Sequence, residues 1–423
     1  MGEKVARLAC YTMVYFVMHA KTLYKNFLFI HWVLLLMWTS LPISASLDKT
    51  AEHNSINTYL SAIHTEITAL RDNENPPKET IHLVLGNQSA DMDSIVSAIT
   101  FAYSNADKGF YVPVINSPRE ELPLRGDVQH VFETLHIKPD SLLYQDDLPF
   151  LLKLAMQGHI RLTLVDHNLL AHDQKAFENY VERVIDHHKD EQVVYPLMIE
   201  GETVIAKAGS NSTLIAEGIL ASNPDRMSPQ VAYLLLSAIL LDTKDLKNPA
   251  VTTERDIAIA NLLKDRAEDY YTATLYALLM QSRNAVSHLT PDLLLKKDYK
   301  TYKEGNFFYG IAGIPKGTLW TAENRTQWKS AFEKALKKKK LHLLSALIYE
   351  DGVFIVYIPD GELQTAFLSH LQETPALNEQ LILKDYFPDE GLFFFDLTTP
   401  LQRKQLQPLF LFKESLNIQD AIP

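Results

Sequence analysis

The chain has 423 residues, a length that suits two domains, and its 47% hydrophobic and 22% charged residues are typical of a globular protein. Its 40 basic and 52 acidic residues give a net charge of −12, which argues against a nucleic-acid-coating function but permits a polyanionic substrate held with divalent cations. Cys10 is the only cysteine, so a disulfide framework and a cysteine-based metal site are excluded. Any metal would be held by Asp, His or Asn, which suit Mg²⁺, Mn²⁺ or Co²⁺ better than structural zinc.

The N-terminal segment contains a strongly apolar run over residues 27–37, which follows two lysines and precedes the small-residue sequence Ile43-Ser44-Ala45. The run is short for a membrane-spanning helix, and the pattern predicts a signal peptide or an N-terminal anchor over residues 1–45. An ordinary helix, or a start at Met18, are the alternatives.

Residues 46–79 are predicted to form a helix and a loop, after which strands alternate with helices. The predicted strands cover 81–85, 110–115, 162–165, 181–185 and 193–199. The predicted helices cover 93–104, 171–180, 212–220 and 229–241. This alternation predicts an α/β fold with a doubly wound, mainly parallel sheet, in which ligands collect at the carboxyl ends of the strands.

Residues from about 253 to 286 are predicted to be helical and to lead out of this first domain. A second pattern then begins near Leu293 and comprises strand 307–314, helix 327–340, hairpin strands 343–349 and 353–358, and strand 392–396. The chain is therefore expected to have a first domain over 46–265, a helical linker over 266–290 and a smaller α/β domain over 291–423.

The stretch from Gly86 to Ser94 places two carboxylates, Asp91 and Asp93, at the exit of the first predicted strand. A helix cap followed by a first-turn acid is the structural interpretation of this pair. In the functional interpretation the two carboxylates coordinate two adjacent metal ions. Asn87 then offers a neutral oxygen at the mouth of the same loop.

Two later strands also end in acids or imidazoles. Asp166 follows strand 162–165, where turn chemistry is the structural alternative, and Asp186-His187-His188 follows strand 181–185. Adjacent side chains diverge in a turn, so one imidazole can bind a metal while the other meets the substrate. Asp186 can then orient an imidazole.

Asp242 ends an apolar helix at a position where the helix dipole disfavours a carboxylate. A bound cation would explain that position, and a solvated helix end is the alternative. Four segments that deliver such ligands to strand or helix ends predict a dinuclear metal site. Two divalent ions activate water and clamp the oxygens of a phosphoryl displacement, so the expected substrate is a phosphoanhydride or a phosphoester.

Two basic clusters lie in the second domain. Arg403 and Lys404 are interpreted either as phosphate ligands or as a solvated basic turn. Lys337 to Lys340 end a predicted helix, where cations favour the helix dipole, and they are predicted to form a solvated face.

These segments resemble the DHH phosphoesterase superfamily, in its branch with a DHHA2 C-terminal domain. The matching motifs are Asp91-Met92-Asp93-Ser94, Asp166, Asp186-His187-His188 and Asp242, and the resemblance covers about residues 81–408. Within that branch, the stretches 86–94 and 165–168 are most similar to fungal-type exopolyphosphatase. Family II pyrophosphatases have His where this chain has Asn87, whereas animal prune-like proteins share the Asn. The resemblance implies that the active site lies in a basic cleft between a DHH domain and the smaller DHHA2 domain.

The same resemblance implies the roles of individual residues. It implies two divalent cations, Mg²⁺ or Mn²⁺ with Co²⁺ as a further choice, which Asp166 would bridge. The first cation would be held by Asp91 and Asp166 with Asn87 near it, and the second by Asp93, Asp166, His187 and Asp242. The implied catalytic residues are Asp166, Asp186 and His188. The implied substrate-binding residues are His188, Lys300, Arg403 and Lys404, although Gln402 replaces a Ser of the pyrophosphatase pattern.

The implied function is that of an exopolyphosphatase, which releases terminal orthophosphate from inorganic polyphosphate. An inorganic pyrophosphatase or a nucleotide phosphodiesterase on the same scaffold is one alternative. A weakly active, prune-like partner-binding protein is another. No nucleic-acid polymer is expected as a partner, and a membrane would be reached only through the N-terminal segment.

The cellular location stays open at this stage. The family resemblance implies a cytoplasmic protein, whereas the N-terminal apolar run implies a secreted or membrane-anchored one. Asn87 and Asn211 both match the glycosylation pattern. A glycan on Asn87 would block the predicted site, which argues against the secretory route.

Overall fold

A computed structural model describes residues 55–72, 76–199, 201–314, 324–348, 352–374, 379–399 and 401–410. The predicted N-terminal signal or anchor segment lies outside these residues, as do residues 349–351 in the predicted hairpin. The described residues from Leu60 onward belong to one compact unit. Among the described helices, none combines the length and the apolar character that crossing a bilayer requires.

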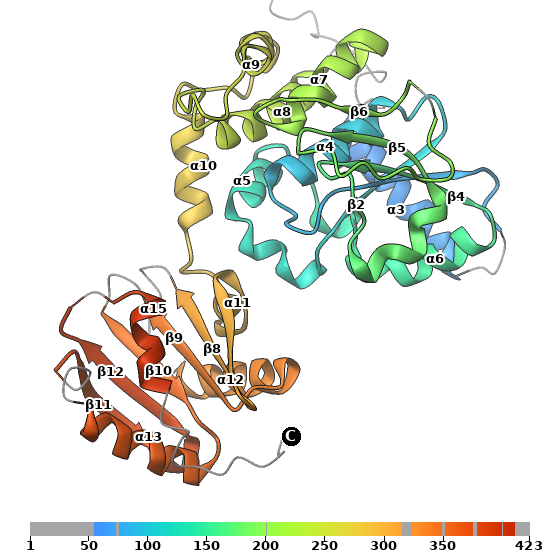
Figure 1. The fold of residues 1–423 in the computed structure, drawn as a ribbon. Coiled ribbons are helices and arrows are strands. Elements are labelled where there is room, and N and C mark those ends of the chain that lie inside the picture. Colours follow the sequence, from blue (N-terminus) through green and yellow to red (C-terminus); the bar gives the residue numbers. More distant parts are fainter. Residues whose placement is uncertain are drawn as a thin grey trace, which may run out of the picture. The chain divides into compact units, whose positions relative to one another are not determined.

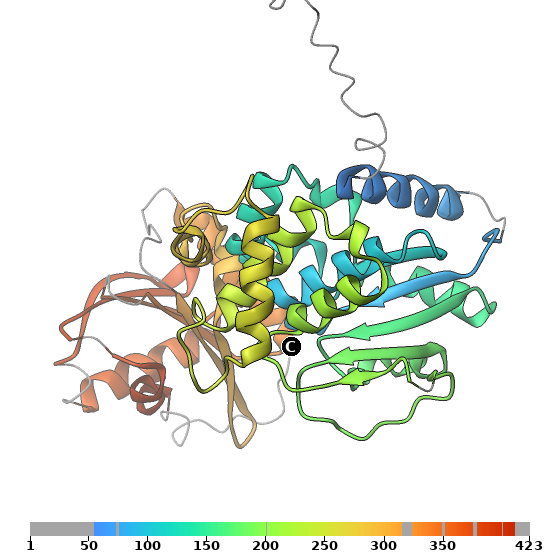
Figure 2. The same cartoon turned by 90° about the horizontal axis from the view of Figure 1, so that it is seen from above.

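The N-terminal half is built on a six-stranded sheet in which all strand pairs are parallel, with the order β3-β2-β1-β4-β5-β6. The strands are β1 (Ile81–Leu85), β2 (Phe110–Ile115), β3 (Leu143–Tyr144), β4 (Ile160–Val165), β5 (Val181–Asp186) and β6 (Val204–Ile205). Figure 2 shows arrows of this sheet pointing the same way. The order reverses between β1 and β4, so the predicted doubly wound sheet is confirmed and its switch point lies between these two strands.

Helices follow most of these strands and cover the sheet (Figure 1). The α-helices of this half are α3 (Ile56–Asp72), α4 (Met92–Ser104), α5 (Gly126–Thr134), α6 (Leu148–Met156), α7 (Asn211–Ser222), α8 (Pro229–Asp242), α9 (Glu254–Arg266) and α10 (Leu275–Asn284). Short 3₁₀ segments are η1 (Arg119–Leu124), η2 (Pro139–Ser141), η3 (Gln145–Asp147), η4 (His172–Tyr180) and η5 (Pro224–Arg226). Every residue of α4 is buried, because this helix packs against β2, α7 and α8.

Three sequence-based expectations for this half were wrong. Residues 193–199 form no strand, and Val194 is 85% exposed; the edge of β5 is instead paired by β6. The apolar run at 193–199 has no neighbouring strand to pair with, and a β-strand requires such a partner for its backbone hydrogen bonds. The helix expected over 171–180 is the 3₁₀ segment η4, and the continuous helix expected over 253–286 is divided into α9 and α10.

The C-terminal half contains a second six-stranded sheet with the order β11-β12-β10-β9-β8-β7. The strands are β7 (Tyr299–Glu304), β8 (Phe307–Ile314), β9 (Leu343–Ile348), β10 (Val353–Tyr357), β11 (Leu381–Phe387) and β12 (Leu392–Leu397). The accompanying helices are α11 (Pro291–Lys297), α12 (Arg325–Lys339), α13 (Gly361–Glu373) and α15 (Arg403–Leu406), with 3₁₀ segments η7 (Pro388–Glu390) and η8 (Gln407–Phe410). Only β8 and β9 pair in parallel, and the predicted antiparallel pair β9–β10 is confirmed.

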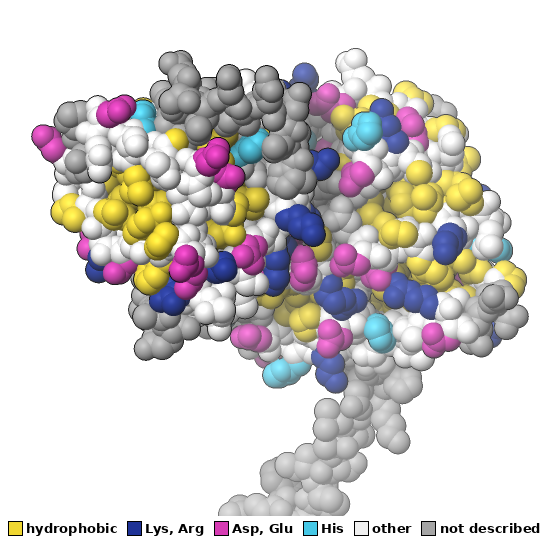
Figure 3. Space-filling view, turned by 90° about the horizontal axis from the view of Figure 1, so that it is seen from below, with side chains coloured by type: hydrophobic (Ala, Val, Ile, Leu, Met, Phe, Trp, Pro, Cys, Tyr) yellow, Lys and Arg dark blue, Asp and Glu magenta, His cyan; other side chains and the backbone are white. Residues whose placement is uncertain are grey.

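Two apolar clusters stabilise this second sheet. Phe367 of α13 and Phe410 of η8 belong to one cluster, and Trp328 and Phe332 of α12 belong to the other. Aromatic side chains bury large areas, so these clusters supply much of the driving force for packing the helices onto the sheet. On the face drawn in Figure 3, basic and acidic side chains lie close together, so the acidic excess of the chain does not form a single acidic surface in this view.

The contact between α5 and α10 depends on a glycine. A Cβ atom added at Gly126 would lie 2.1 Å from the carbonyl oxygen of Ser282, which is backbone and cannot turn away. We expect Gly126→Ala to lower the free energy of unfolding by about 1–3 kcal/mol in urea titrations, because the two helices must separate. Gly218 is the matched control, since it lies in α7 with nothing within 4 Å of an added Cβ. Gly218→Ala should be neutral or stabilise by up to about 1 kcal/mol, and equal losses in both variants would contradict the argument.

Candidate metal centre

The predicted site residues of the first domain converge at the carboxyl edge of the parallel sheet. Asn87 and Asp91 follow β1, Asp166 follows β4, and Asp186 is the last residue of β5. Because β1 and β4 are neighbours at the switch point, their following loops are brought side by side. Gly86 permits the close packing of the first loop, since a Cβ there would lie 2.2 Å from Ser94 Oγ and 3.0 Å from the Ser94 carbonyl oxygen.

Asp166 lies at the centre of this arrangement. Its backbone is held in the left-handed region at φ 64°, and its N–H donates to the carbonyl oxygen of Ile185 at 3.0 Å. Its carboxylate lies 3.2 Å from His187 Nε2 and 3.7 Å from His188 Nδ1. A non-glycine residue with positive φ costs free energy, and such residues gather at functional sites.

Asn87 contacts Asp166 through its amide nitrogen. Nδ2 donates to Asp166 Oδ2 at 2.5 Å and to the Asp166 carbonyl oxygen at 3.1 Å. The side-chain oxygen of Asn87 accepts hydrogen bonds from Ser89 N and Oγ. In this conformation Asn87 orients the Asp166 carboxylate, and its own oxygen faces Ser89.

Asp91 and Asp93 have different surroundings. Asp91 caps α4 by accepting from Ser94 N at 3.1 Å, as the structural interpretation of the pair predicted. Asp93 is buried at the N-terminus of α7, where it accepts from the backbone N–H groups of Asn211 and Ser212 at 2.5 and 2.8 Å. Ser212 Oγ donates to it at 2.6 Å. Helix N-termini favour an anion, so the Asp93 carboxylate is firmly positioned, 3.8 Å from His187 Nε2.

The two adjacent histidine rings do not diverge as expected for a turn: their centroids lie 4.3 Å apart and both rings face Asp166. Their Nδ1 atoms nevertheless have different partners. His187 Nδ1 lies 3.1 Å from the Ala208 carbonyl oxygen, so that nitrogen carries a hydrogen and Nε2 faces Asp166. This arrangement is typical of an imidazole whose second nitrogen binds a metal. Burial by itself would lower the pKa of His187, but its hydrogen bond to Asp166 and the charge of Asp93 outweigh burial and raise the pKa to about 10.

His188 is oriented by Asp186. Its Nδ1 lies 2.8 Å from Asp186 Oδ1, and its side chain is 56% exposed whereas that of Asp186 is fully buried. The hydrogen bond to Asp186 raises the pKa of His188 above its ordinary value. Burial would raise the pKa of Asp186, yet its hydrogen bonds with His188 and Asn168 keep that pKa low. Asp186 therefore fixes the orientation of the His188 ring at the surface of the site.

The donor set fits divalent cations. Ligand atoms of Asp166, His187 and His188 lie within 4.8 Å of one another. Asp242 ends α8 as predicted, and its Oδ2 is buried without a hydrogen-bond partner among the described residues. The pKa of Asp242 is raised well above its ordinary value, mainly by burial and further by the negative charges of Asp93 and Asp91. The pKa of Asp166 is raised to about 7, mainly by burial and further by the negative charge of Asp93. Such mutual repulsion among buried carboxylates is what a cation relieves.

The predicted phosphate-binding residues of the second domain form their own group. Arg403, at the start of α15, lies 2.8 Å from Asp298 Oδ1 and donates to the Asp298 carbonyl oxygen at 3.3 Å. Lys300 lies two residues beyond Asp298, exposed on β7. Lys404 is exposed on α15. The structure thus brings Arg403 to the start of the segment that carries Lys300, although the two lie about a quarter of the chain apart in sequence.

Sequence reasoning missed several residues that support the site. Asn168 donates to Asp186 Oδ2 at 2.5 Å and to the Lys189 carbonyl oxygen at 3.0 Å, a supporting contact that the sequence did not specify. Arg125 donates through Nε to the Ala90 carbonyl oxygen at 3.0 Å and also binds the Ser89 carbonyl oxygen. No local pattern indicated Arg125, because its partners lie in another loop. Asn211 is fully buried, which disfavours its use as a glycosylation acceptor in the folded protein.

Comparison with known proteins identifies two domains. The family model for the DHH family, N-terminal domain, matches residues 82–239, and that for the DHHA2 domain matches residues 277–411. "Exopolyphosphatase PRUNE1" of Mus musculus is 33% identical over 232 residues, which are 53% of this chain and 50% of the relative. "Putative exopolyphosphatase" of Schizosaccharomyces pombe is 31% identical over 263 residues, 58% of this chain and 66% of the relative.

A third relative is named as a pyrophosphatase. "Manganese-dependent inorganic pyrophosphatase" of Methanothrix thermoacetophila is 26% identical over 272 residues, 63% of this chain and 80% of the relative. The chain spans about half the length of the PRUNE1 relatives it matches. Both family models agree with the family assigned from the motifs. The chain therefore carries a domain of the DHH family followed by a DHHA2 domain.

Proposed function

We propose that the protein is an exopolyphosphatase, which uses water to break the terminal phosphoanhydride bond of inorganic polyphosphate and releases orthophosphate. The observation that carries this proposal is the group of Asp166, His187 and His188 at the switch point of the parallel sheet. The relatives named exopolyphosphatase support the choice of substrate.

The proposed cofactors are two divalent cations, Mn²⁺ or Mg²⁺. They would be held by Asp91, Asp93, Asp166, His187 and Asp242, with Asn87 beside Asp166. When bound, such ions lower the pKa of water and neutralise charge on the transferred phosphoryl group. The name of the manganese-dependent relative supports manganese as the first metal to test.

The chain's own side chains would then place the substrate and move a proton. Asp166 would help to hold both cations, and Asn87 Nδ2 would keep its carboxylate in position. His188, whose Nδ1 is engaged by Asp186, would present Nε2 to an oxygen of the terminal phosphate. The hydrogen bond to Asp186 raises the pKa of His188, which favours its protonated form and a charge-assisted hydrogen bond to phosphate.

The phosphates of the polyphosphate substrate that are not released would be bound by Lys300, Arg403 and Lys404. Arg offers a fork that matches two phosphate oxygens, and Lys acts as a point charge. Arg403 is held by Asp298 in this structure, so a phosphate group would compete with that carboxylate. The proposal that these residues face the metal centre across a cleft follows from the family resemblance.

A substrate panel with metal titration tests the proposed function. Purified full-length protein should release orthophosphate from long-chain polyphosphate in the presence of Mn²⁺ or Mg²⁺. Pyrophosphate is the second candidate substrate, because the relative named inorganic pyrophosphatase is covered over 80% of its length. Hydrolysis of pyrophosphate alone, or of a nucleotide phosphodiester alone, would replace the proposal. Absence of both hydrolysis and metal binding would favour a partner-binding protein.

Asn87 offers a direct test of substrate preference. The Asn87→His variant is expected to shift the ratio of kcat/KM values toward pyrophosphate, because an imidazole adds a metal ligand where an amide now binds Asp166. The ratio should change by about tenfold or more, since removal of a ligand-positioning contact changes metal affinity or activity by about 10–100-fold. Gln88→His is the matched control, because Gln88 lies in the same loop and binds Asp173 instead. An unchanged ratio in Asn87→His would exclude this role.

A further inference from the structure

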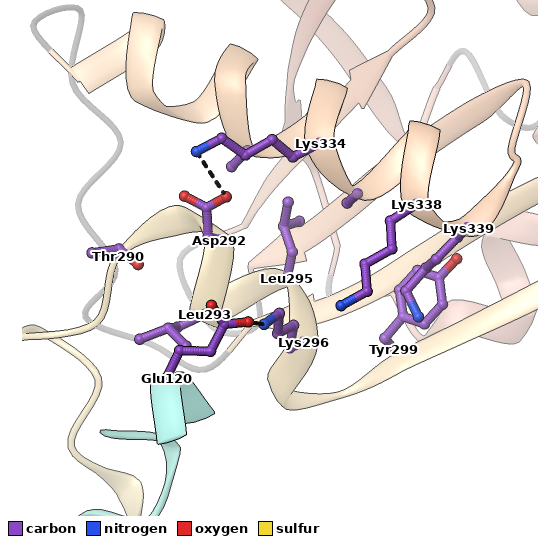
Figure 4. Close-up of a pocket in the computed structure, with 12 residues that line it drawn as sticks. Glu120, Thr290, Asp292, Leu293, Leu295, Lys296, Tyr299, Lys334, Lys338 and Lys339 are labelled. Carbon is purple, nitrogen blue, oxygen red and sulfur yellow. Dashed lines mark hydrogen bonds and ion pairs between the residues drawn. The ribbon is translucent and has the colours of Figure 1, made fainter. Parts of the chain in front are cut away.

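A cavity lies away from the residues assigned to the metal centre. It has a volume of about 430 Å³ and is formed by α11, α12 and the start of β7, with Glu120 of η1 at its edge (Figure 4). Ligand cavities for small molecules have volumes of about 300–1,000 Å³. None of the residues that line this cavity belongs to the proposed catalytic or phosphate-binding set.

The shape of the cavity follows from one face of α12. Ala331, Lys334, Ala335, Lys338 and Lys339 all line it, with the spacing of residues on one side of a helix. The two alanines leave the space open because their side chains are short. The lysines on either side of them extend over that space.

The lysines of the cavity fall into two classes. Lys296 is held by Glu120 at 2.8 Å and Glu121 at 3.1 Å, and Lys334 lies 3.6 Å from Asp292. Neither Lys338 nor Lys339 forms an ion pair with a carboxylate in the part of the chain that the structure describes. The four lysines that line the cavity outnumber its two acids, Glu120 and Asp292, so the lining carries a net positive charge.

The free lysines face a wall that is largely apolar. Lys339 Nζ lies 4.2 Å from the centre of the Tyr299 ring, and Leu293 and Leu295 line the same space. In Figure 4 the side chain of Lys338 extends from α12 toward Lys296. The helix dipole accounts for lysines at the end of α12, but it does not account for a cavity beneath two of them.

We propose that this cavity binds an oligophosphate anion through Lys338 and Lys339. Lysine is a point-charge ligand for phosphate, and two ammonium groups without carboxylate partners match an anion with several charges. A divalent cation is excluded as the occupant by the lysines. The cavity is large enough for more than one phosphate group, and either inorganic tripolyphosphate or a nucleoside triphosphate presents that chemistry.

Binding is best measured in full-length Asp166→Asn, which removes a proposed metal ligand so that the probe is not hydrolysed. Calorimetry with inorganic tripolyphosphate and EDTA should give a site that weakens by about tenfold or more in Lys338→Ala/Lys339→Ala, since each lysine contributes a charge-assisted contact. The affinity should also fall as salt rises, because partly exposed charges are screened. Adding Arg403→Ala to the background separates this site from the proposed substrate site.

Lys337→Ala/Lys340→Ala is the matched control, because these lysines flank the pair on the same helix end and do not line the cavity. It should leave the affinity unchanged. An equal loss in both double variants would show a diffuse charge effect and would overturn the proposal, as would tripolyphosphate binding that neither variant alters. A second titration with ATP in place of tripolyphosphate distinguishes the two ligands. If ATP binds more tightly than tripolyphosphate, and Tyr299→Leu abolishes that difference, the site recognises the nucleotide. If both bind equally, the site recognises the phosphates alone. Because hydrolysis is not measured, these results do not depend on the proposed catalytic activity.

Discussion

Asp166→Asn is expected to reduce orthophosphate release by at least about 10³-fold, which corresponds to about 4 kcal/mol of transition-state stabilisation. Asp166 accepts from Asn87, lies 3.2 Å from His187 Nε2, and is the proposed bridge between the cations. An amide cannot supply the negative charge that holds two divalent ions. The measurement is kcat/KM for polyphosphate at saturating Mn²⁺, together with the metal stoichiometry by calorimetry.

The same variant should remain folded. Asn tolerates the positive φ at position 166. The substitution also removes a buried carboxyl group whose pKa is raised by burial and by the charge of Asp93. We therefore expect the metal-free Tm to be unchanged or higher. Asp190→Asn is the matched control, because Asp190 is an exposed acid in the loop after β5 that accepts only from Gln192 N among the described residues. Activity of Asp166→Asn within tenfold of the parent would refute the central role of Asp166.

Removal of the divalent metal is expected to lower the stability of the folded protein, and the size of this loss should depend on pH. The carboxyl of Asp166 has a folded-state pKa of about 7 against an ordinary value of 3.8, and His187 has one of about 10 against 6.5. In both cases the folded protein binds protons more tightly than the unfolded chain does. The stability they contribute is therefore present at low pH, and it is lost between about 3.8 and 7 for Asp166 and between about 6.5 and 10 for His187.

The metal-free protein should consequently lose stability as the pH rises from 5 to 9. Divalent cations replace these protons, so added Mn²⁺ should raise the Tm little at pH 5 and substantially at pH 8. A free Mn²⁺ concentration 100-fold above the Kd adds about 2.7 kcal/mol to the free energy of unfolding. Asp242→Asn should flatten the pH dependence of the metal-free protein, because it removes another carboxyl with a raised pKa. A Tm shift with Mn²⁺ that is equal at both pH values would contradict this account.

The local pattern of the sequence was sufficient for the central elements of the fold. β1, β2 and β8 begin and end at the predicted residues, because buried strands are continuous apolar runs bounded by polar residues. The edge strands β7 and β11 were not predicted. Leu381 is the only buried residue of these two strands, and each strand pairs on one side only, so they lack the apolar pattern of a buried strand. The proposed domain boundaries at 265, 290 and 291 stay predictions.

The sequence by itself predicted which side chains are candidates for the chemistry, and it determined that they stand at the ends of strands or helices. Asp91, Asp166 and Asp242 occupy such ends, because the change of period from strand to helix is a local property. Only the tertiary structure decided how these groups are paired. Asp186 orients His188 rather than His187, Asn87 turns its nitrogen toward Asp166, and Asp93 is held by the N-terminus of α7. Asp93 and Asn211 are 118 residues apart, and contacts at that separation depend on how the sheet and its helices pack, which no local pattern encodes.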